Sequence, residues 1–283
     1  MSAAIRLVAK HVEKPWGRRD LGPFFGAVGP AHEPVGEVWF ALPPGADPRE
    51  PELLVKYLFT RQRLSIQVHP DDAAAQASGH PRGKDEAWVV VAADPDAVIG
   101  LGPRARLDRD QLRAAALDGS VETLIDWRPV RSGDVLYSPA GTIHAIGAGL
   151  VVIEVQQNFD LTYRLYDYGS TRALQLDDAV AVADIEVYRA AFDRHPAAPG
   201  REILVSGPKF ILERWLRHGP HRLRASASHP VWVIPLDGSA TLDGVPLQPG
   251  EVWLADASGE FDLAVGSTLL LAYAGATLLV DGE

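Results

Sequence analysis

Cysteine is absent from the 283-residue sequence, which excludes a disulfide framework and any metal or redox site built on thiols. Long apolar runs are absent too, since no segment approaches the ~20 apolar residues that span a bilayer. The opening stretch, MSAAIRLVAKHVEKPWG, has no apolar core of signal-peptide length. We therefore expect a cytoplasmic protein with no membrane partner.

Positive charge is also scarce. The formal net charge is −10, and lysine occurs only at positions 10, 14, 56, 84 and 209. Such an acidic chain repels nucleic-acid phosphates and anionic lipids, so we expect neither as a partner. If the substrate is an anion, the site must provide its own cations.

What is present points to a globular β protein. Hydrophobic residues make up 47% and charged residues 23% of a chain long enough for two modest domains. Glycine (26) and proline (22) separate short runs rich in β-forming residues, such as LLVKYLF, EAWVVVA, LVVIEVQ, VWVIPLD and TLLLAYA. Many short strands between turn signals predict an all-β barrel or sandwich.

Two stretches interrupt the strand pattern. Residues 107–126 favour a helix, with Asp108 as its N-cap and Gly119 as its stop. A second helical segment is expected near 176–190.

The sequence RHPAAPG at 194–200 has the composition of a linker. We therefore predict a first domain at 1–193, with the helical insertion inside it, and a second domain at 201–283.

The strand RLSIQVHP alternates between two kinds of side chain. Because neighbouring side chains of a strand face opposite sides, Ser65, Gln67 and His69 share one face, and the apolar residues at 64, 66 and 68 share the other. A polar face of this composition suits a lined cavity. The alternative is a half-exposed edge strand.

Two further segments supply metal-ligand side chains. In GKDEAWVVV, Lys84 and Glu86 fall on one strand face, although such a pair is often merely solvated. The segment from Gly133 to His144 has the pattern G-x5-P-x-G-x2-H, which resembles the second motif of the cupin superfamily. The family pattern ends in Asn, where this chain has Ala148. The alternative is a turn followed by a structural histidine.

Together, Gln67, His69, Glu86 and His144 offer an amide oxygen, two imidazoles and a carboxylate. This set suits zinc or a related divalent ion, with coordination positions left for water or a substrate oxygen. Four such donors on the expected inner faces of one barrel predict a metal site.

A weak internal repeat relates the two predicted domains. GDVLYSPAGTIH begins at Gly133 and GEVWLADASGEF at Gly250, and both run from glycine and an acid through an apolar strand into a turn. Two unrelated β-hairpins would also look this similar. If the segments are duplicates, Phe261 holds the position of His144, so the second barrel would be degenerate and metal-free.

The ordered motifs resemble a known family, type I mannose-6-phosphate isomerase in its short bacterial form. They are KPWG, GEVW, LLVKYL, LSIQVHPDD, GKDEAW, GTIHAIGAG and IEVQQNFDLTYRLYDYG, within residues 10–170. The resemblance implies two cupin (jelly-roll) β-barrels in tandem, with zinc bound by Gln67, His69, Glu86 and His144.

The resemblance also implies roles for six further residues. Catalytic roles fall to Arg164, Glu154 and Lys84, and substrate contacts to Ser65, Lys56 and Asp160. Ordinary alternatives exist for several of them: Arg164 as a surface arginine, Glu154 as a buried structural acid, and Asp160 as a turn residue.

Departures from the family pattern cluster on one rim of the expected site. Phe159 stands where the family has Ser, Gly169 begins the replacement of an Asp-Arg pair, and Gln175 stands where it has His. These changes spare the metal set but leave a different sugar phosphate open as substrate.

We therefore expect a zinc-dependent aldose–ketose isomerase that interconverts mannose 6-phosphate and fructose 6-phosphate through an enediolate, as a monomer or homodimer. The general base is left open between Glu154 and a metal-bound water. The alternatives are a cupin isomerase or epimerase acting on another sugar phosphate, and a non-catalytic sugar-binding cupin.

Overall fold

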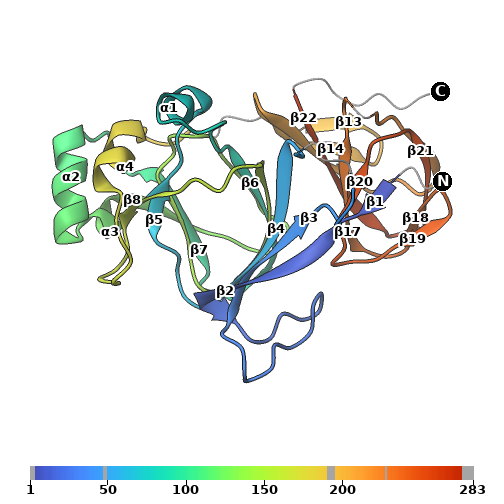
Figure 1. Ribbon diagram of the computed structural model, residues 1–283, viewed down its shortest axis with the longest axis horizontal. Helices are drawn as coiled ribbons and strands as arrows, with labels where there is room; N and C mark the ends of the chain where they lie inside the picture. The colour runs from blue at the N-terminus through green and yellow to red at the C-terminus, as the bar shows by residue number, and fades with distance from the viewer. Residues whose placement is uncertain (1–3, 47–49, 190–194, 227, 276–283) are drawn as a thin grey trace.

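The computed structural model describes residues 4–46, 50–189, 195–226 and 228–275, which form two antiparallel β-barrels side by side (Figure 1). Each barrel is built from two sheets, so the predicted all-β fold of two tandem barrels is confirmed. Helices α2 (Arg109–Asp118), α3 (Val121–Leu124) and α4 (Leu176–Val182) lie on the first barrel, at the end away from the second (Figure 1).

The first barrel combines a six-stranded and a five-stranded sheet. The six strands, in sheet order, are β2 (Val8–Arg18), β3 (Val35–Ala41), β4 (Leu53–Thr60), β11 (Leu150–Gln157), β6 (Glu86–Ala93) and β9 (Val135–Ser138). The five strands are β12 (Tyr163–Tyr166), β5 (Ile66–Val68), β10 (His144–Ile146), β7 (Val98–Pro103) and β8 (Ile125–Pro129).

The second barrel combines a seven-stranded and a four-stranded sheet. The seven strands are β1 (Ala4–Arg6), β20 (Trp253–Ala255), β17 (Val231–Asp237), β22 (Thr268–Ala274), β15 (Phe210–Trp215), β14 (Arg201–Ser206) and β13 (His195–Ala198). The four strands are β16 (Gly219–Leu223), β21 (Gly259–Leu263), β18 (Ala240–Leu242) and β19 (Val245–Leu247).

Four short helices complete the described part of the fold: α1 (Asp72–Ala77), α2 (Arg109–Asp118), α3 (Val121–Leu124) and α4 (Leu176–Val182). The N-cap and stop predicted for the inserted helix are confirmed. Asp108 forms a capping box with Gln111, and Gly119 ends α2 with a φ of 84°, a conformation that glycine adopts readily. No helix in the described ranges is both long and apolar enough to cross a membrane.

Both predicted helical segments are shorter than expected. The first breaks into α2 and α3 and passes into β8 at Ile125, where the chain pairs with β7. The second ends at Val182 because the backbone N–H of Asp184 bonds instead to the carbonyl of Gly141, at 2.7 Å.

The second barrel's main sheet extends into sequence that was not expected there. In the predicted linker 194–200, residues 195–198 form β13 and pair with β14, while residue 194 lies outside the described ranges. At the other edge of this sheet, β1 pairs with β20, although its residues lie within the predicted first domain. The division at 1–193 and 201–283 stays a prediction, with β1 as an exception to it.

The six-stranded and seven-stranded sheets pack against each other and share one apolar core. Tyr57 and Ile153 of the first barrel belong to the same buried cluster as Phe210 and Trp232 of the second. On β11, alternate residues face this shared core, and Glu154 between them faces into the first barrel. Both faces of the strand are therefore covered, which accounts for its nearly continuous apolar sequence.

Among the described residues, the interior of the second barrel is apolar around one buried ion pair. Phe261, which the repeat aligns with His144, is fully buried there. Glu213 is also fully buried and receives two hydrogen bonds from Arg201, at 2.6 and 2.7 Å, and one from the Trp215 indole at 2.9 Å. The Tyr273 hydroxyl donates to the same carboxylate.

Replacing Arg201 by methionine should destabilise the protein strongly, because the buried carboxylate of Glu213 would lose the guanidinium that pairs with it. We expect Arg201→Met to lower the free energy of unfolding by about 3–5 kcal/mol in urea titrations. The matched control is Arg214→Met on β15, whose ion pair with Glu202 is partly exposed. Its loss should stay below about 1 kcal/mol. Equal losses of free energy of unfolding in the two variants would contradict the stabilising role assigned to the buried Arg201–Glu213 ion pair.

Candidate metal centre

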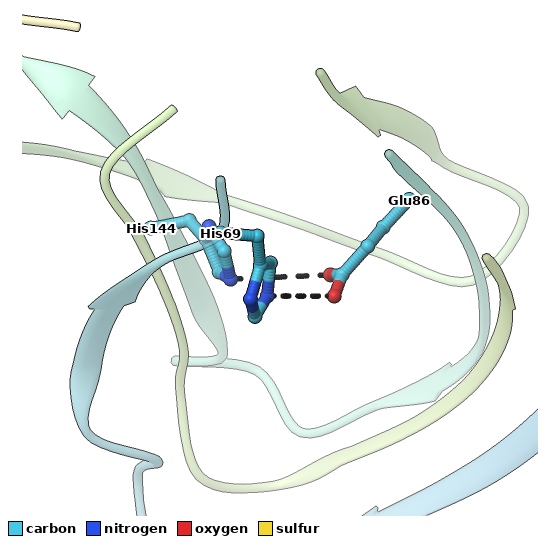
Figure 2. A group of neighbouring side chains, drawn as sticks. All are labelled: His69, Glu86 and His144. Atoms are coloured by element: carbon cyan, nitrogen blue, oxygen red, sulfur yellow. Dashed lines mark ion pairs between the residues drawn. The ribbon is translucent and has the colours of Figure 1, made fainter. Parts of the chain in front are cut away.

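Three side chains meet inside the first barrel: His69 after β5, Glu86 at the start of β6 and His144 at the start of β10 (Figure 2). Their ligand atoms all lie within 4.8 Å of one another, and all three residues are buried. His69 Nε2 is 2.8 Å from Glu86 Oε1, and His144 Nε2 is 3.9 Å from Glu86 Oε2. The structure thus brings together three of the four predicted ligands around one point.

Local chain geometry explains how the two histidines meet. The turn before β10 passes through Gly141 with a φ of 87°, and its backbone N–H bonds to the carbonyl of His69 at 2.8 Å. His144 then pairs directly with Gln67 in the antiparallel ladder. The glycine and the register therefore deliver the imidazole of His144 beside that of His69, with ring centroids 4.8 Å apart.

Each imidazole uses its Nδ1 atom to hold its orientation. Nδ1 of His69 lies 2.8 Å from the Leu161 carbonyl, and Nδ1 of His144 lies 2.9 Å from the Thr142 carbonyl. A carbonyl only accepts, so Nδ1 carries the hydrogen and Nε2 keeps its lone pair. In both rings the atom that faces Glu86 is therefore an Nε2 without a hydrogen, which is the usual arrangement of metal-binding histidines.

Gln67, the fourth predicted ligand, borders the same point. Its side-chain nitrogen is 3.2 Å from His144 Nε2, while its oxygen accepts from the Ser65 hydroxyl at 3.3 Å. The two amide atoms have the same shape and are assigned from their neighbours. Rotating the amide by half a turn would direct the oxygen to the ligand cluster.

A divalent cation fits these residues. His69 Nε2 is fully buried and, with the ring hydrogen on Nδ1, makes no hydrogen bond, although buried polar atoms are nearly always partnered. A cation bound beside the Glu86 carboxylate would satisfy this atom. Two imidazoles and a carboxylate, with an amide oxygen nearby, are ligands typical of zinc and related ions.

The protonation states also favour a cation. Burial lowers the pKa of His69, and it lowers the pKa of His144 to about 4. Burial opposes ionisation of Glu86, but the ammonium of Lys84, 2.8 Å away, holds its pKa well below the usual range. At neutral pH the centre therefore consists of two neutral imidazoles and a carboxylate, the forms that bind metal.

A cavity of about 240 Å³ opens beside the ligands and is lined by the side chains that the sequence assigned to substrate and catalysis. They are Lys56, Ser65, Gln67, Lys84, Glu154, Asp160 and Arg164. The strand β5 that supplies part of this wall lies between β12 and β10, so the alternative of an edge strand is wrong. Leu64 lines the cavity as well, because β5 begins only at Ile66 and the expected alternation does not extend to it.

Sequence reasoning missed three charged residues of this cavity: Lys14, Glu37 and Arg172. The first two lie in the KPWG and GEVW motifs, which carried the resemblance without an assigned role. Their nearness to the site depends on β2 and β3 pairing into the sheet that contains β4, and this pairing leaves no local signal.

The cavity carries five basic and three acidic side chains: Lys14, Lys56, Lys84, Arg164 and Arg172 against Glu37, Glu154 and Asp160. Lys56 and Lys84 are only 3% exposed, so the alternative of a solvated Lys84–Glu86 pair is wrong. The ammonium of Lys56 lies 3.1 Å from Asp160 and 3.5 Å from Glu154, and that of Lys84 lies 3.6 Å from Asp160.

Glu154 has the most unusual carboxyl group of the cavity. Burial, together with the nearby charge of Glu86, raises its pKa to about 7. Its Oε2 accepts from the Trp88 indole at 2.9 Å, and its Oε1 faces Lys56. The group can therefore exist both with and without its proton near neutral pH.

Arg164 lies at the cavity wall on β12, and its backbone is held by Gln175. The backbone N–H of Arg164 donates to the side-chain oxygen of Gln175 at 3.1 Å, and the backbone N–H of Gln175 donates to the carbonyl of Arg164 at 3.0 Å. The other two departures from the family pattern lie outside the cavity lining. Phe159 packs against His80, with ring centroids 5.4 Å apart, and Gly169 occupies a turn.

No family model matches the chain, but its sequence is similar to those of curated proteins. It is 36% identical to a mannose-6-phosphate isomerase of Streptococcus mutans over 185 residues, which cover 62% of this chain and 58% of that protein. It is 30% identical over 236 residues to YvyI of Bacillus subtilis, which carries a provisional mannose-6-phosphate isomerase name; these residues cover 78% of this chain and 74% of YvyI.

A solved structure is similar over nearly the whole chain. The crystal structure of the mannose 6-phosphate isomerase from Bacillus subtilis superposes with a TM-score of 0.82 and 27% sequence identity. The match covers 96% of this chain and 99% of that one.

Removing one imidazole from the cluster should abolish metal binding. We expect His144→Ala to retain far less zinc than the unaltered protein after dialysis, as measured by elemental analysis, because the cluster loses a ligand and gains a void. The matched control is His229→Ala, at an exposed histidine of the second barrel. Equal zinc contents in the two variants would contradict the assignment of the site.

The raised pKa of Glu154 should appear in the pH dependence of stability of the chelated protein. Between about pH 4.5 and 7 the folded protein holds a proton on Glu154 that the unfolded chain has lost, so this group lowers stability as the pH rises. Glu154→Gln removes the effect. We therefore compare the free energy of unfolding of Glu154→Gln with that of the unaltered protein. Their difference should shift in favour of the variant by on the order of 3 kcal/mol as the pH rises through this window.

The measurement is urea unfolding at several pH values, with Glu33→Gln as the control at an exposed glutamate. If the difference in free energy of unfolding between Glu154→Gln and the unaltered protein does not change with pH, the raised pKa of Glu154 is contradicted.

Proposed function

We propose that this chain, which belongs to the mannose-6-phosphate isomerase family, interconverts mannose 6-phosphate and fructose 6-phosphate with a bound divalent ion, zinc being the expected one. One observation carries the proposal: the His69–Glu86–His144 cluster lies beside a cavity with an excess of basic side chains. The cluster is suited to a metal ion, and the cavity is suited to an anionic sugar.

The metal would be held by His69, His144 and Glu86, with the amide oxygen of Gln67 as a fourth ligand. A bound divalent cation supplies Lewis-acid stabilisation to an oxygen that gains negative charge during the reaction. Lys84 keeps Glu86 ionised and so keeps the donor set ready for the ion.

Aldose–ketose isomerisation moves a proton between C1 and C2 of the sugar. Glu154 is suited to take this proton and return it, since its pKa of about 7 matches a group that works in both directions near neutral pH. The Trp88 indole and the Lys56 ammonium hold its two oxygens from opposite sides. A general base of this kind typically contributes ~10²–10⁴-fold to the rate.

The cationic side chains would bind the phosphate and stabilise negative charge on the sugar. Arg164 is the best placed, because within the described residues its guanidinium makes one hydrogen bond, to the Ala173 carbonyl, and no ion pair. Its remaining donors can bind two oxygens at once. Arg172 is held at the same wall by the buried carboxylate of Asp167.

The acidic side chains of the cavity set the position of the lysines. Asp160 contacts both Lys56 and Lys84, so it aligns the two ammonium groups along one wall. Ser65, through its hydrogen bond to Gln67, adds a neutral hydroxyl next to the ligand set, where a sugar hydroxyl would lie.

The test is a coupled assay of fructose 6-phosphate formation from mannose 6-phosphate. We expect turnover by the purified protein, loss of turnover after chelation and recovery when zinc is added back. Arg164→Lys should lower kcat/KM by about tenfold or more, since an ammonium cannot make the bidentate contact. Arg63→Lys, at an arginine outside the cavity lining, is the matched control.

Absence of turnover in a folded, zinc-loaded sample would refute the substrate assignment. A screen of other sugar phosphates would then separate a related isomerase or epimerase from a sugar-binding protein without activity.

A further inference from the structure

A turn of the second barrel touches the part of the first barrel that leads to the metal centre. This turn, residues 207–209, connects β14 and β15. The ammonium of Lys209 donates to Asp72 at the start of α1, with 2.5 Å between Nζ and Oδ2. Each side chain of this pair is about one-third exposed, so the contact lies at the border of the two barrels.

Asp72 in turn holds the segment before β6. Its Oδ1 accepts from the backbone N–H of Gly83 at 2.7 Å and from the side-chain amide of Gln157 at 3.1 Å. Gln157 completes the contact, because its side-chain oxygen accepts from the backbone N–H of Asp85 at 3.0 Å. Asp72 is therefore bonded to one end of segment 83–85 directly and to the other end through Gln157.

A second contact from the same turn reaches the same segment. A Cβ atom on Gly207 would lie 2.5 Å from the Tyr137 hydroxyl, and the ring of Phe210 packs edge-on against that of Tyr137. The Tyr137 hydroxyl donates to the carboxylate of Asp85, whose other oxygen accepts from the backbone N–H of Ala140 at 3.0 Å. Two independent contacts of the second barrel thus converge on segment 83–85.

Segment 83–85 carries Lys84 and is followed directly by Glu86. Their charged atoms are 2.8 Å apart, and Glu86 Oε1 is also 2.8 Å from His69 Nε2. A shift of the segment by a few tenths of an ångström would therefore move the carboxylate ligand and its ammonium neighbour together.

We propose that Lys209 is a positioning residue for the metal centre: through Asp72 it holds segment 83–85, and so sets the placement of Glu86 and Lys84. The inference rests on the proposed metal site and reaction. It gives the second barrel a defined part in the chemistry of the first. Lys209 itself lines no part of the cavity and contacts none of the proposed ligands.

The test measures zinc affinity and steady-state kinetics on the same variants of the full chain. Lys209→Met removes the charge and keeps the length of the side chain. We expect its dissociation constant for zinc, from competition with a chromophoric chelator, to rise by about tenfold, the lower end for loss of a supporting partner. We expect kcat to fall by a similar factor and KM to change little. Lys209→Arg, which can restore the ion pair, should recover most of both.

A double-mutant cycle identifies the route. If Lys209 acts through Asp72, then Lys209→Met combined with Asp72→Asn should be no more impaired than the worse single variant. Gly207→Ala, which pushes on Tyr137 from the same turn, should also weaken zinc binding. The control is Lys10→Met, at an exposed lysine of β2, which should leave both readouts unchanged.

Lys209→Met with unchanged zinc affinity and unchanged kcat would overturn the inference, even if its free energy of unfolding falls. So would full additivity of the two single changes. Zinc binding by the unaltered protein without turnover of mannose 6-phosphate would refute the proposed reaction alone, because the affinity measurements still test Lys209. Absence of zinc binding by the unaltered protein would overturn both.

Discussion

The first barrel depends on pairing the charges that it buries. Lys56, Lys84, Glu86 and Glu154 are each at most 4% exposed, and an unpaired charge at such depth costs several kcal/mol. Each of them lies within 3.5 Å of an opposite charge. Lys84 and Glu86 are near neighbours in the sequence, but Lys56 on β4 and Glu154 on β11 are distant, so these two charges meet only when the strands have paired. In the ladder, Glu154 lies opposite Lys56 on one side and Trp88 on the other. A slip of one residue would turn Glu154 into the apolar core and an apolar side chain into the site.

The apolar core shared by the two barrels offsets the free-energy cost of burying these charged side chains. The outward side chains of β4 and β11 are apolar and are covered by the main sheet of the second barrel. Burial of that face stabilises the sheet by about 25 cal/mol per Å² of apolar surface removed from water. The inner face is then free to carry charged residues, which contribute little net stability. Among its described residues, the second barrel buries one such ion pair, Glu213 with Arg201, in an otherwise apolar interior. The two barrels share a fold, but the candidate metal centre lies in the first.

Local signals in the sequence were sufficient for much of this description. The strands follow from short apolar runs between turns, α2 from its cap and stop, and the metal ligands from donor chemistry combined with the turn before His144. Contacts that depend on the pairing of strands far apart in the sequence leave no local signal. Lys14 and Glu37 reach the cavity only because β2 and β3 join the sheet of β4, and β1 crosses to the second barrel by pairing with β20. Leu64 was misplaced because strand alternation was extended beyond the start of β5.

The departures from the family pattern have a physical consequence that the sequence alone left open. Gln175 replaces a histidine, yet it brackets the backbone of Arg164 with two hydrogen bonds, one from its side chain and one from its own backbone. Phe159 and Gly169 lie in loops outside the cavity lining. The charges suited to a phosphorylated sugar are placed mainly by strands and by the ion pairs between them, which these loops do not alter. We therefore expect the departures to affect how firmly Arg164 is held, rather than the class of substrate that the cavity accepts.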